Sequence, residues 1–276
     1  MVEYQSKSPI EKFRAQEMEN HKILLQYHKD KRSNMVDISQ VMPLLARSKM
    51  KCMYAVNHYS RIGLMSVLMD VMAKSCDFSG ERLRMITFAP ARYALNLEDA
   101  NTFKPSSMKK MISHYMQGHD YVGMIEPAYY PNSLHPETSR KGVIHWHAHF
   151  LSWGSGKVKI SKIKKLANAK HDSLVHGCSA FHTKTVKVGE VPSTLAYIFK
   201  SPRNAYCSFI SAREGQNIAG EKLLASMKQR KKRLRPGEAA RLALAMKDFD
   251  LDQLLVSGGE GKVFVEQIGA QAFGRR

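Results

Sequence analysis

The sequence predicts an α+β protein in which two crossover helices pack on one face of a small, mainly antiparallel sheet. Three observations lead to this prediction. Short apolar stretches alternate with amphipathic ones through the middle of the chain, both ends read as mostly helical, and hydrophobic residues make up 43% of the 276 positions. A chain of this length and apolar content can bury a sizeable core.

The two flanking segments are expected to be helical. Residues 1–45 are mostly polar with a small apolar set, and residues 53–74 have the stronger apolar pattern of a buried helix. We therefore divide the chain into a helical N-terminal segment, residues 1–78, a central domain, residues 79–210, and a basic, mostly helical C-terminal segment, residues 211–276.

The central domain is expected to follow the order strand, helix, strand, strand, helix, strand, helix. Pro90 ends the first strand, and Pro202 ends the last helix. The loop between the second and third strands is rich in Pro, Asn and Ser and spans residues 127–140. The expected strands are 83–88, 121–126, 142–153 and 180–188, and the expected helices are 106–117, 157–169 and 192–200.

The C-terminal segment contains a strongly basic run. Residues 228–235 hold six basic side chains in eight positions. A run of this kind is a solvated charged helix or linker about as often as it is a segment that binds DNA. Pro236 and Gly237 break the run, and a helix is expected over residues 238–246.

The chain as a whole is strongly basic. Lys and Arg number 43 against 24 acidic residues, which gives a formal net charge of +19. Such a field favours polyanionic partners, nucleic acid above all, although anionic membranes also attract it. Lys159 and Lys162, on the expected helix 157–169, are candidates for contacts along a phosphate backbone, or they serve only solubility.

The spacing of the four cysteines and the length of the apolar stretches indicate the cellular compartment of the protein. The cysteines are widely separated and form no CxxC pair, which argues against a structural zinc site and a disulfide scaffold. The N-terminus is charged from Glu3 onward and has no apolar signal core. The most apolar stretch, residues 62–72, is too short to span a bilayer. We expect a cytoplasmic protein with no membrane partner.

The sharpest local feature is an alternation of three histidines, His145, His147 and His149, in the third expected strand. Alternate side chains of a strand share one face, so the three imidazoles point the same way while Trp146 and Ala148 face the core. Imidazoles two positions apart are separated by about 7 Å along the strand, which suits a shared divalent cation. A polar sheet face with exposed histidines is the alternative.

Glu126 ends the strand that precedes the histidines. A short antiparallel connection would set the two strands side by side, and the carboxylate would then complete a site of two histidines and one glutamate. Mixed nitrogen and oxygen ligands suit Mg²⁺ or Mn²⁺ with open positions for substrate oxygens, and zinc would also bind. An acidic residue at a strand end is otherwise common without any metal.

Tyr197 and Lys200 lie three residues apart on the last expected helix and therefore on one side of it. A tyrosine hydroxyl can attack a phosphodiester if a metal polarises the phosphate and a cation stabilises the developing charge. Lys200 is the candidate for that cation. An ordinary amphipathic helix would also explain the pattern.

Taken in order, these motifs resemble those of HUH endonucleases. Such enzymes carry a strand with a Thr in a hydrophobic run, then a His-hydrophobic-His strand, then a helix in which a Lys follows the nucleophilic Tyr by three residues. The matching stretches here are Met85-Ile86-Thr87-Phe88, His145-Trp146-His147 and Tyr197-Ile198-Phe199-Lys200. The resemblance covers about residues 80–207 and is greatest to replication proteins, in which a Glu strand precedes a Gly-x-x-His-aromatic-His strand.

The resemblance implies an RRM-like sheet, a divalent cation and a tyrosine that becomes 5′-phosphotyrosine. Tyr197 would be the nucleophile, Lys200 would orient the phosphate, and His145, His147 and Glu126 would hold Mg²⁺ or Mn²⁺. The implied function is that of a rolling-circle replication initiator, which nicks single-stranded or hairpin origin DNA, leaves a free 3′-OH primer and later rejoins the strands. A host helicase and a DNA polymerase would be its partners.

This chain departs from the family pattern at two places. His149 stands where the family usually has an aliphatic residue, so His147 and His149 form an alternative ligand pair, although we favour His145 and His147. No second Tyr stands four residues from Tyr197, so the match is to single-tyrosine enzymes, with Tyr206 as a distant second candidate. Thr87 is expected to be a structural or DNA-contacting residue.

Four other functions stay open. A conjugative relaxase or a single-strand transposase would use the same chemistry, although here the Tyr follows the histidines, which favours replication. A non-catalytic basic DNA-binding protein would bind in the presence of a chelator. A metal-dependent hydrolase that uses water would cut DNA without forming a covalent adduct.

Overall fold

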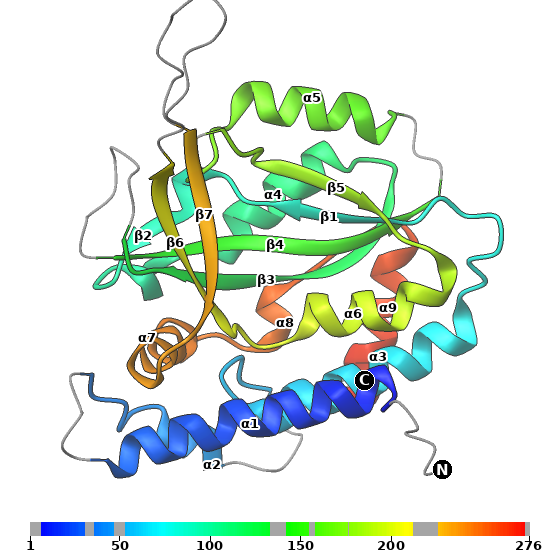
Figure 1. Ribbon diagram of the computed structural model, residues 1–276. Coiled ribbons are helices and arrows are strands. Elements are labelled where there is room, and N and C mark those ends of the chain that lie inside the picture. Colours follow the sequence, from blue (N-terminus) through cyan, green and yellow to red (C-terminus); the bar gives the residue numbers. More distant parts are fainter. Residues whose placement is uncertain are drawn as a thin grey trace, which may run out of the picture.

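The computed structural model describes residues 7–30, 36–46, 53–132, 142–154, 158–175, 177–211 and 226–273. In this part of the chain the fold is α+β, as predicted: helices cover both sides of one curled, mixed sheet of eight strands (Figure 1). Neighbouring strands pair antiparallel except β3 and β6, which make a single parallel pairing at Tyr129 and Ala205.

The sheet runs in the order β5-β1-β4-β3-β6-β7, with β2 added to β4 and β8 added to β3. The two longest strands, β3 and β4, therefore occupy its centre. The strands are β1 Arg84–Phe88, β2 Ala94–Asn96, β3 Asp120–Tyr130, β4 Val143–Trp153, β5 Phe181–Thr185, β6 Asn204–Ser211, β7 Ser226–Arg233 and β8 Leu255–Gly258.

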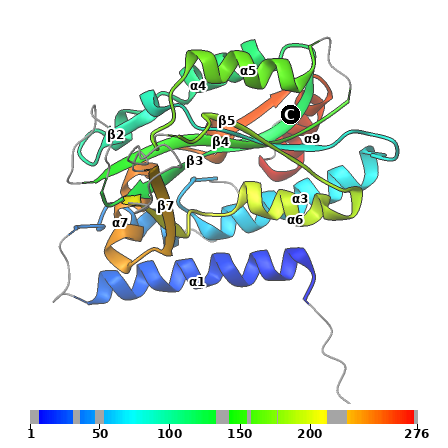
Figure 2. The same cartoon turned by 45° about the horizontal axis from the view of Figure 1, so that its top comes forward.

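The helices form layers on the two sides of the sheet. The two crossover helices α4 and α5 lie on one side, and α1, α3 and α6 lie on the other (Figure 2). The helices are α1 Pro9–Lys29, α2 Met42–Ala46, α3 His58–Ser75, α4 Pro105–Tyr115, α5 Ile160–Lys170, α6 Val191–Phe199, α7 Pro236–Met246, α8 Leu251–Leu254 and α9 Glu260–Phe273.

Local sequence signals fix the start of the two long N-terminal helices. Ser8 and Glu11 form a reciprocal capping box at α1, with Pro9 at the first helical position. The Asn57 side chain caps α3 by accepting a hydrogen bond from the Ser60 amide. These two helices pack against each other and against α6, so the N-terminal segment covers one side of the sheet.

The hairpin of β3 and β4 forms the centre of the hydrophobic core. Every position of β4 is buried, because helices cover both of its faces. Trp146 stacks on Phe103 at a ring-centroid distance of 4.5 Å and donates a hydrogen bond to the Ala100 carbonyl. The same core cluster contains residues from all three predicted segments, from Phe13 in α1 to Ile268 in α9.

Two expectations about local structure were wrong. The expected loop 127–140 begins too early, because β3 continues to Tyr130; the rest of that loop from residue 133 lies outside the described residues. The basic run 228–235 is mostly strand β7 and not a helix or linker, because it pairs antiparallel with β6 at the edge of the sheet. Lysine and arginine are well tolerated on an edge strand, where charge prevents pairing with other chains.

Candidate metal centre

Three buried side chains converge at the middle of the β3–β4 hairpin. Glu126 on β3 is in register with His147 on β4, and His149 follows two positions along the same strand. Because alternate side chains share one face of a strand, all three point to the side on which α6 lies. The alternation read from the sequence therefore becomes a cluster through the pairing of the two strands.

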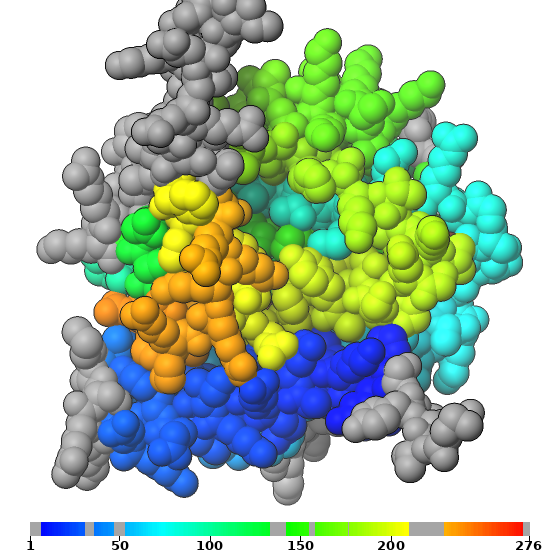
Figure 3. Space-filling model, in the orientation of Figure 1, coloured from blue at the N-terminus to red at the C-terminus, as the bar shows by residue number. Residues whose placement is uncertain are grey.

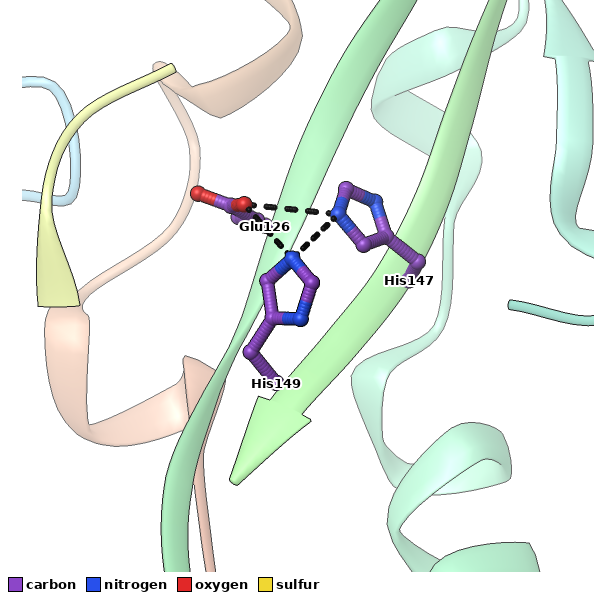
Figure 4. A group of neighbouring side chains, drawn as sticks. All are labelled: Glu126, His147 and His149. Carbon is purple, nitrogen blue, oxygen red and sulfur yellow. Dashed lines mark hydrogen bonds and ion pairs between the residues drawn. The ribbon is translucent and has the colours of Figure 1, made fainter. Parts of the chain in front are cut away.

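The three side chains present their ligand atoms to one another (Figure 4). Oε1 of Glu126 lies 3.3 Å from Nε2 of His147 and 3.3 Å from Nε2 of His149, and the two Nε2 atoms lie 3.1 Å apart. Atoms that share an ion at about 2.0–2.2 Å are separated by roughly 3–3.5 Å. The group can thus hold a metal ion.

The second oxygen of the carboxylate supports the same conclusion. Glu126 Oε2 is buried and has no hydrogen-bond partner. A buried carboxylate oxygen without a partner is costly, because its lost hydration is not replaced. A bound cation would remove that cost.

Each histidine is also held through its other ring nitrogen. Nδ1 of His149 lies 2.8 Å from the Thr87 hydroxyl on β1, and Nδ1 of His147 lies 3.3 Å from the carbonyl oxygen of His145. Partners of this kind fix the ring orientation and leave Nε2 as the ligand atom. Thr87 therefore orients a histidine of the cluster; whether it also contacts DNA stays a prediction.

The structure brings His149, and not His145, to Glu126 and His147. His145 is in register with Ala128, two positions beyond Glu126, and its Nε2 lies 3.0 Å from the Pro90 carbonyl oxygen. The pair that we favoured from the sequence is thus replaced by the alternative pair, His147 and His149. Strand register decides this, since all three histidines share one face.

Tyr197 and Lys200 lie beside the cluster, as the sequence predicts. The rings of Tyr197 and His149 are 5.2 Å apart. Nζ of Lys200 lies 4.0 Å from the centroid of the Tyr197 ring and 3.5 Å from Oε1 of Glu126. A phenol, a cation and a candidate metal group therefore meet at one place.

The electrostatics of the site keep the ligands ready for a cation. Burial raises the pKa of Glu126, but the charge of Lys200 and hydrogen bonds from His147 and His149 lower it by more, so its pKa lies well below the usual range. Burial lowers the pKa of His149 to about 4. At neutral pH the site holds a carboxylate and a neutral imidazole, the forms that bind metals.

The phenol is in its protonated form at neutral pH. Burial and, to a lesser extent, the charge of Glu126 raise the pKa of Tyr197 to about 12. A tyrosine in this state needs a nearby positive charge before it becomes a good nucleophile.

A cavity of about 390 Å³ leads to the tyrosine from the side of β1 and β5. Its walls come from these strands and from α6; Lys184 and His182 are exposed on β5. In the space-filling view the sheet is visible in a hollow between α6, in yellow-green, and the basic strand β7, in orange (Figure 3). The lining residues are Met85, Thr87, His182, Lys184, Ser193, Thr194 and Tyr197.

The two lysines predicted to follow a phosphate backbone lie elsewhere. Lys159 is the N-cap of α5 and Lys162 lies in its first turn, both exposed. Helix α5 covers the side of the sheet opposite α6 (Figure 2), so neither lysine joins the cluster. Lys231, in the basic run 228–235 on β7, lies near the site: partial burial and the charge of Lys200 lower its pKa, while the charge of Glu126 raises it.

Comparisons with known proteins do not assign the chain to a family. No family model, no curated protein and no solved structure matches the chain. Among the described helices, none combines the length and the apolar character of a membrane span. The fold and the site thus define an α+β protein with a buried Glu-His-His group that can hold a metal ion.

Proposed function

We propose that the chain is a metal-dependent nicking and joining enzyme of the HUH type, which initiates rolling-circle replication. The observation that carries the proposal is the position of Tyr197, whose ring lies 5.2 Å from the ring of His149 and under the Lys200 ammonium. A tyrosine with an adjacent cation and a candidate metal group has what covalent attack on a phosphodiester requires.

Each residue of the site would have a separate chemical role. Glu126, His147 and His149 would hold Mg²⁺ or Mn²⁺, which would withdraw charge from the scissile phosphate. Oη of Tyr197 would attack the phosphorus in line while its proton passes to solvent. The bond between phosphorus and the 3′ oxygen would break, and that oxygen would take up a proton from solvent to become a free hydroxyl. Lys200 would balance negative charge on the phosphate and the phenolate.

The products account for joining without an external energy source. One phosphodiester bond breaks and one phosphotyrosine bond forms, so a 3′-OH on DNA can later attack the phosphotyrosine and restore the strand. The released 3′-OH would serve a polymerase as a primer. Single-stranded origin DNA as the substrate, and a host helicase and polymerase as partners, are parts of this proposal.

The net charge of +19 and the cavity beside Tyr197, which has Lys184 in its wall, support a nucleic-acid substrate. The cavity is of a size that binds small molecules or parts of larger ones. A strand lying in it would meet the exposed side chains of His182 and Lys184 on the way to Tyr197.

The test is a covalent-adduct assay on labelled single-stranded DNA that carries candidate origin hairpins, with Mn²⁺ or with EDTA. Wild type is compared with Tyr197→Phe, which keeps the ring against His149 and Lys200, and with Tyr206→Phe as the matched control. We expect a denaturant-resistant band that requires Mn²⁺, disappears in Tyr197→Phe and persists in Tyr206→Phe.

Each other outcome assigns a different function. Metal-dependent cleavage without an adduct would mean that water is the nucleophile. Binding that survives EDTA, with no cleavage across a broad pool of sequences, would mean a non-catalytic DNA-binding protein. An adduct that disappears only in Tyr206→Phe would transfer the nucleophile to β6.

A further inference from the structure

The end of helix α6 is held by two buried charged residues of the N-terminal helices. Glu17 on α1 is 0% exposed and Arg61 on α3 is 1% exposed. Charged side chains are almost never buried so completely unless they are paired or hydrogen-bonded. Both of these contact the backbone at residues 199–201, directly after the turn that carries Tyr197.

Arg61 binds the last carbonyl groups of α6. Its Nη1 donates to the carbonyl oxygens of Phe199, at 3.2 Å, and of Lys200, at 3.4 Å, while Nε donates to the carbonyl oxygen of Ala55 at 2.9 Å. The last carbonyls of a helix have no partner within it, and a cation there also complements the helix dipole. The guanidinium therefore fixes the C-terminal end of α6 to α3.

Glu17 binds the next residue of the chain. The Ser201 amide donates to Oε1 of Glu17 at 2.7 Å, and the Ser201 hydroxyl donates to Oε2. Oε2 also lies 2.8 Å from Nδ1 of His58, at the start of α3. One carboxylate of α1 thus joins α3 to the residue that follows Lys200.

Ser201, His58 and Glu17 have the residue types of a hydrolase triad, but their arrangement is different. In a triad the histidine stands between the hydroxyl and the carboxylate. Here the hydroxyl donates directly to the carboxylate, and Ser201 is itself buried. The contacts hold the chain in place and do not activate a nucleophile.

The consequence for Lys200 is specific. Arg61 binds the carbonyl oxygen of Phe199, in the peptide before Lys200. The peptide after Lys200 is bound through its carbonyl oxygen by Arg61 and through the Ser201 amide by Glu17, so the Cα of Lys200 is fixed from both sides. From this fixed point the side chain reaches 3.5 Å from Glu126 and 4.0 Å from the Tyr197 ring centroid. Small shifts of such groups cost large factors in rate.

We propose that Arg61 and Glu17 are positioning residues that set Lys200 and Tyr197 against the metal-binding group. The proposal rests on the proposed nicking function, in which these two residues act. It makes the N-terminal helices part of the active site. Buried charges are costly unless they are hydrogen-bonded, and these two are hydrogen-bonded to the backbone around Lys200, which a role in positioning explains.

The first arm of the test measures rate and affinity separately. We compare wild type with Arg61→Lys, which keeps the charge but loses the fork of donors, with Glu17→Ala, and with Glu17→Gln, which keeps an acceptor for the Ser201 amide. Leu68→Ala is the control, because Leu68 is buried on the same helix α3 about two turns beyond Arg61. The substrate is the oligonucleotide that wild type cleaves in the adduct assay.

We expect Arg61→Lys and Glu17→Ala to lower the single-turnover cleavage rate about tenfold or more while the Kd for DNA changes less than about twofold. Glu17→Gln restores most of the rate lost in Glu17→Ala. Leu68→Ala loses thermal stability but cleaves at a near-wild-type rate. Equal loss of rate in Leu68→Ala, or an unchanged rate in Arg61→Lys, overturns the proposal.

The second arm does not depend on cleavage. In metal-free protein with ¹³C-labelled tyrosine rings, Tyr197→Phe identifies the Tyr197 signal and Lys200→Met shows its position without the ammonium over the ring. We expect Arg61→Lys and Glu17→Ala to move the signal towards that position, and Leu68→Ala to leave it unchanged. If wild type cleaves no DNA, the proposed function is refuted, but this arm still tests whether Arg61 and Glu17 position Lys200 over the Tyr197 ring. A Tyr197 signal that does not move in either variant refutes the positioning.

Discussion

Oε1 of Glu126 lies 3.3 Å from Nε2 of His149, although the two residues are not directly opposite each other in the hairpin. Glu126 is in register with His147, and His149 reaches it diagonally across the strand pair. Diagonal neighbours of this kind are within reach for long and aromatic side chains. This contact makes His149, and not His145, the second histidine of the candidate metal centre.

The first prediction concerns which of His145 and His149 is a metal ligand. His149→Ala lowers the affinity for Mn²⁺ by about 100-fold or more, because a ligand atom is lost. His145→Ala changes the affinity by less than about threefold, because His145 Nε2 lies against the Pro90 carbonyl oxygen and outside the cluster. Isothermal titration with Mn²⁺ checks both. A larger loss in His145→Ala would return it to the ligand set.

The second prediction concerns the hydroxyl behind His149. Thr87→Val keeps the shape of the side chain but removes the partner of His149 Nδ1. We expect a loss of Mn²⁺ affinity of about 10–100-fold, as is usual for groups that orient a ligand. Thr87→Ser keeps the hydroxyl and serves as the control. Equal affinities in the two variants would show that Thr87 does not orient the ring.

The third prediction concerns Gly123, which allows β3 to approach β4. A Cβ atom at this position would lie 2.1 Å from the carbonyl oxygen of His149 and 2.3 Å from Cβ of Phe150. Gly123→Ala therefore forces the central strands apart and costs about 1–3 kcal/mol or more, together with metal affinity. Gly189→Ala, where a Cβ meets nothing within 4 Å, is the control. Thermal melting with and without Mn²⁺ measures both effects.

The fourth prediction concerns stability in acid. Burial raises the pKa of Glu17, but the hydrogen bond from His58 and the charges of His58 and Arg61 lower it by more, so the net pKa is below its ordinary value of 4.5. The folded protein then binds fewer protons than the unfolded chain, and the stability gained from Glu17 is present above pH 4.5 and is lost as the pH falls further.

Glu17→Gln is the variant that tests this pH dependence. It is less stable than wild type at pH 7, because it loses the charged acceptor of the His58 and Ser201 hydrogen bonds and the negative charge near Arg61. The difference narrows below pH 4.5, as wild type loses its contribution from the carboxylate. Thermal melting between pH 7 and pH 3 measures the gap, and a gap that stays constant over that range would contradict the depressed pKa.

Much of the candidate site could be predicted because it depends on short-range geometry. Strand alternation puts His145, His147 and His149 on one face. Helical spacing predicts that Tyr197 and Lys200 lie on one side, although α6 ends at Phe199 and Lys200 is its C-cap. Glu126 joins the histidines because its strand, β3, pairs with the strand that carries them, β4. The predicted RRM-like fold and the DNA chemistry stay predictions.

What could not be predicted depends on pairing between distant residues. The basic run of β7 has no apolar alternation, so only its partner β6 makes it a strand. Arg61 could have been noticed as a lone charge in an apolar helix, but nothing local points to Glu17 or to the end of α6, which lies 138 residues further along the chain.

The sequence by itself determined the α+β class, the shared face of the three histidines and the order of the motif residues, because strand and helix periodicities act over a few residues. Only the tertiary structure decided that His149 and not His145 joins Glu126, and that two buried N-terminal charges hold Lys200. Register and buried ion pairing are set by the packing of segments far apart in the sequence, and a local pattern carries no information about which of them meet.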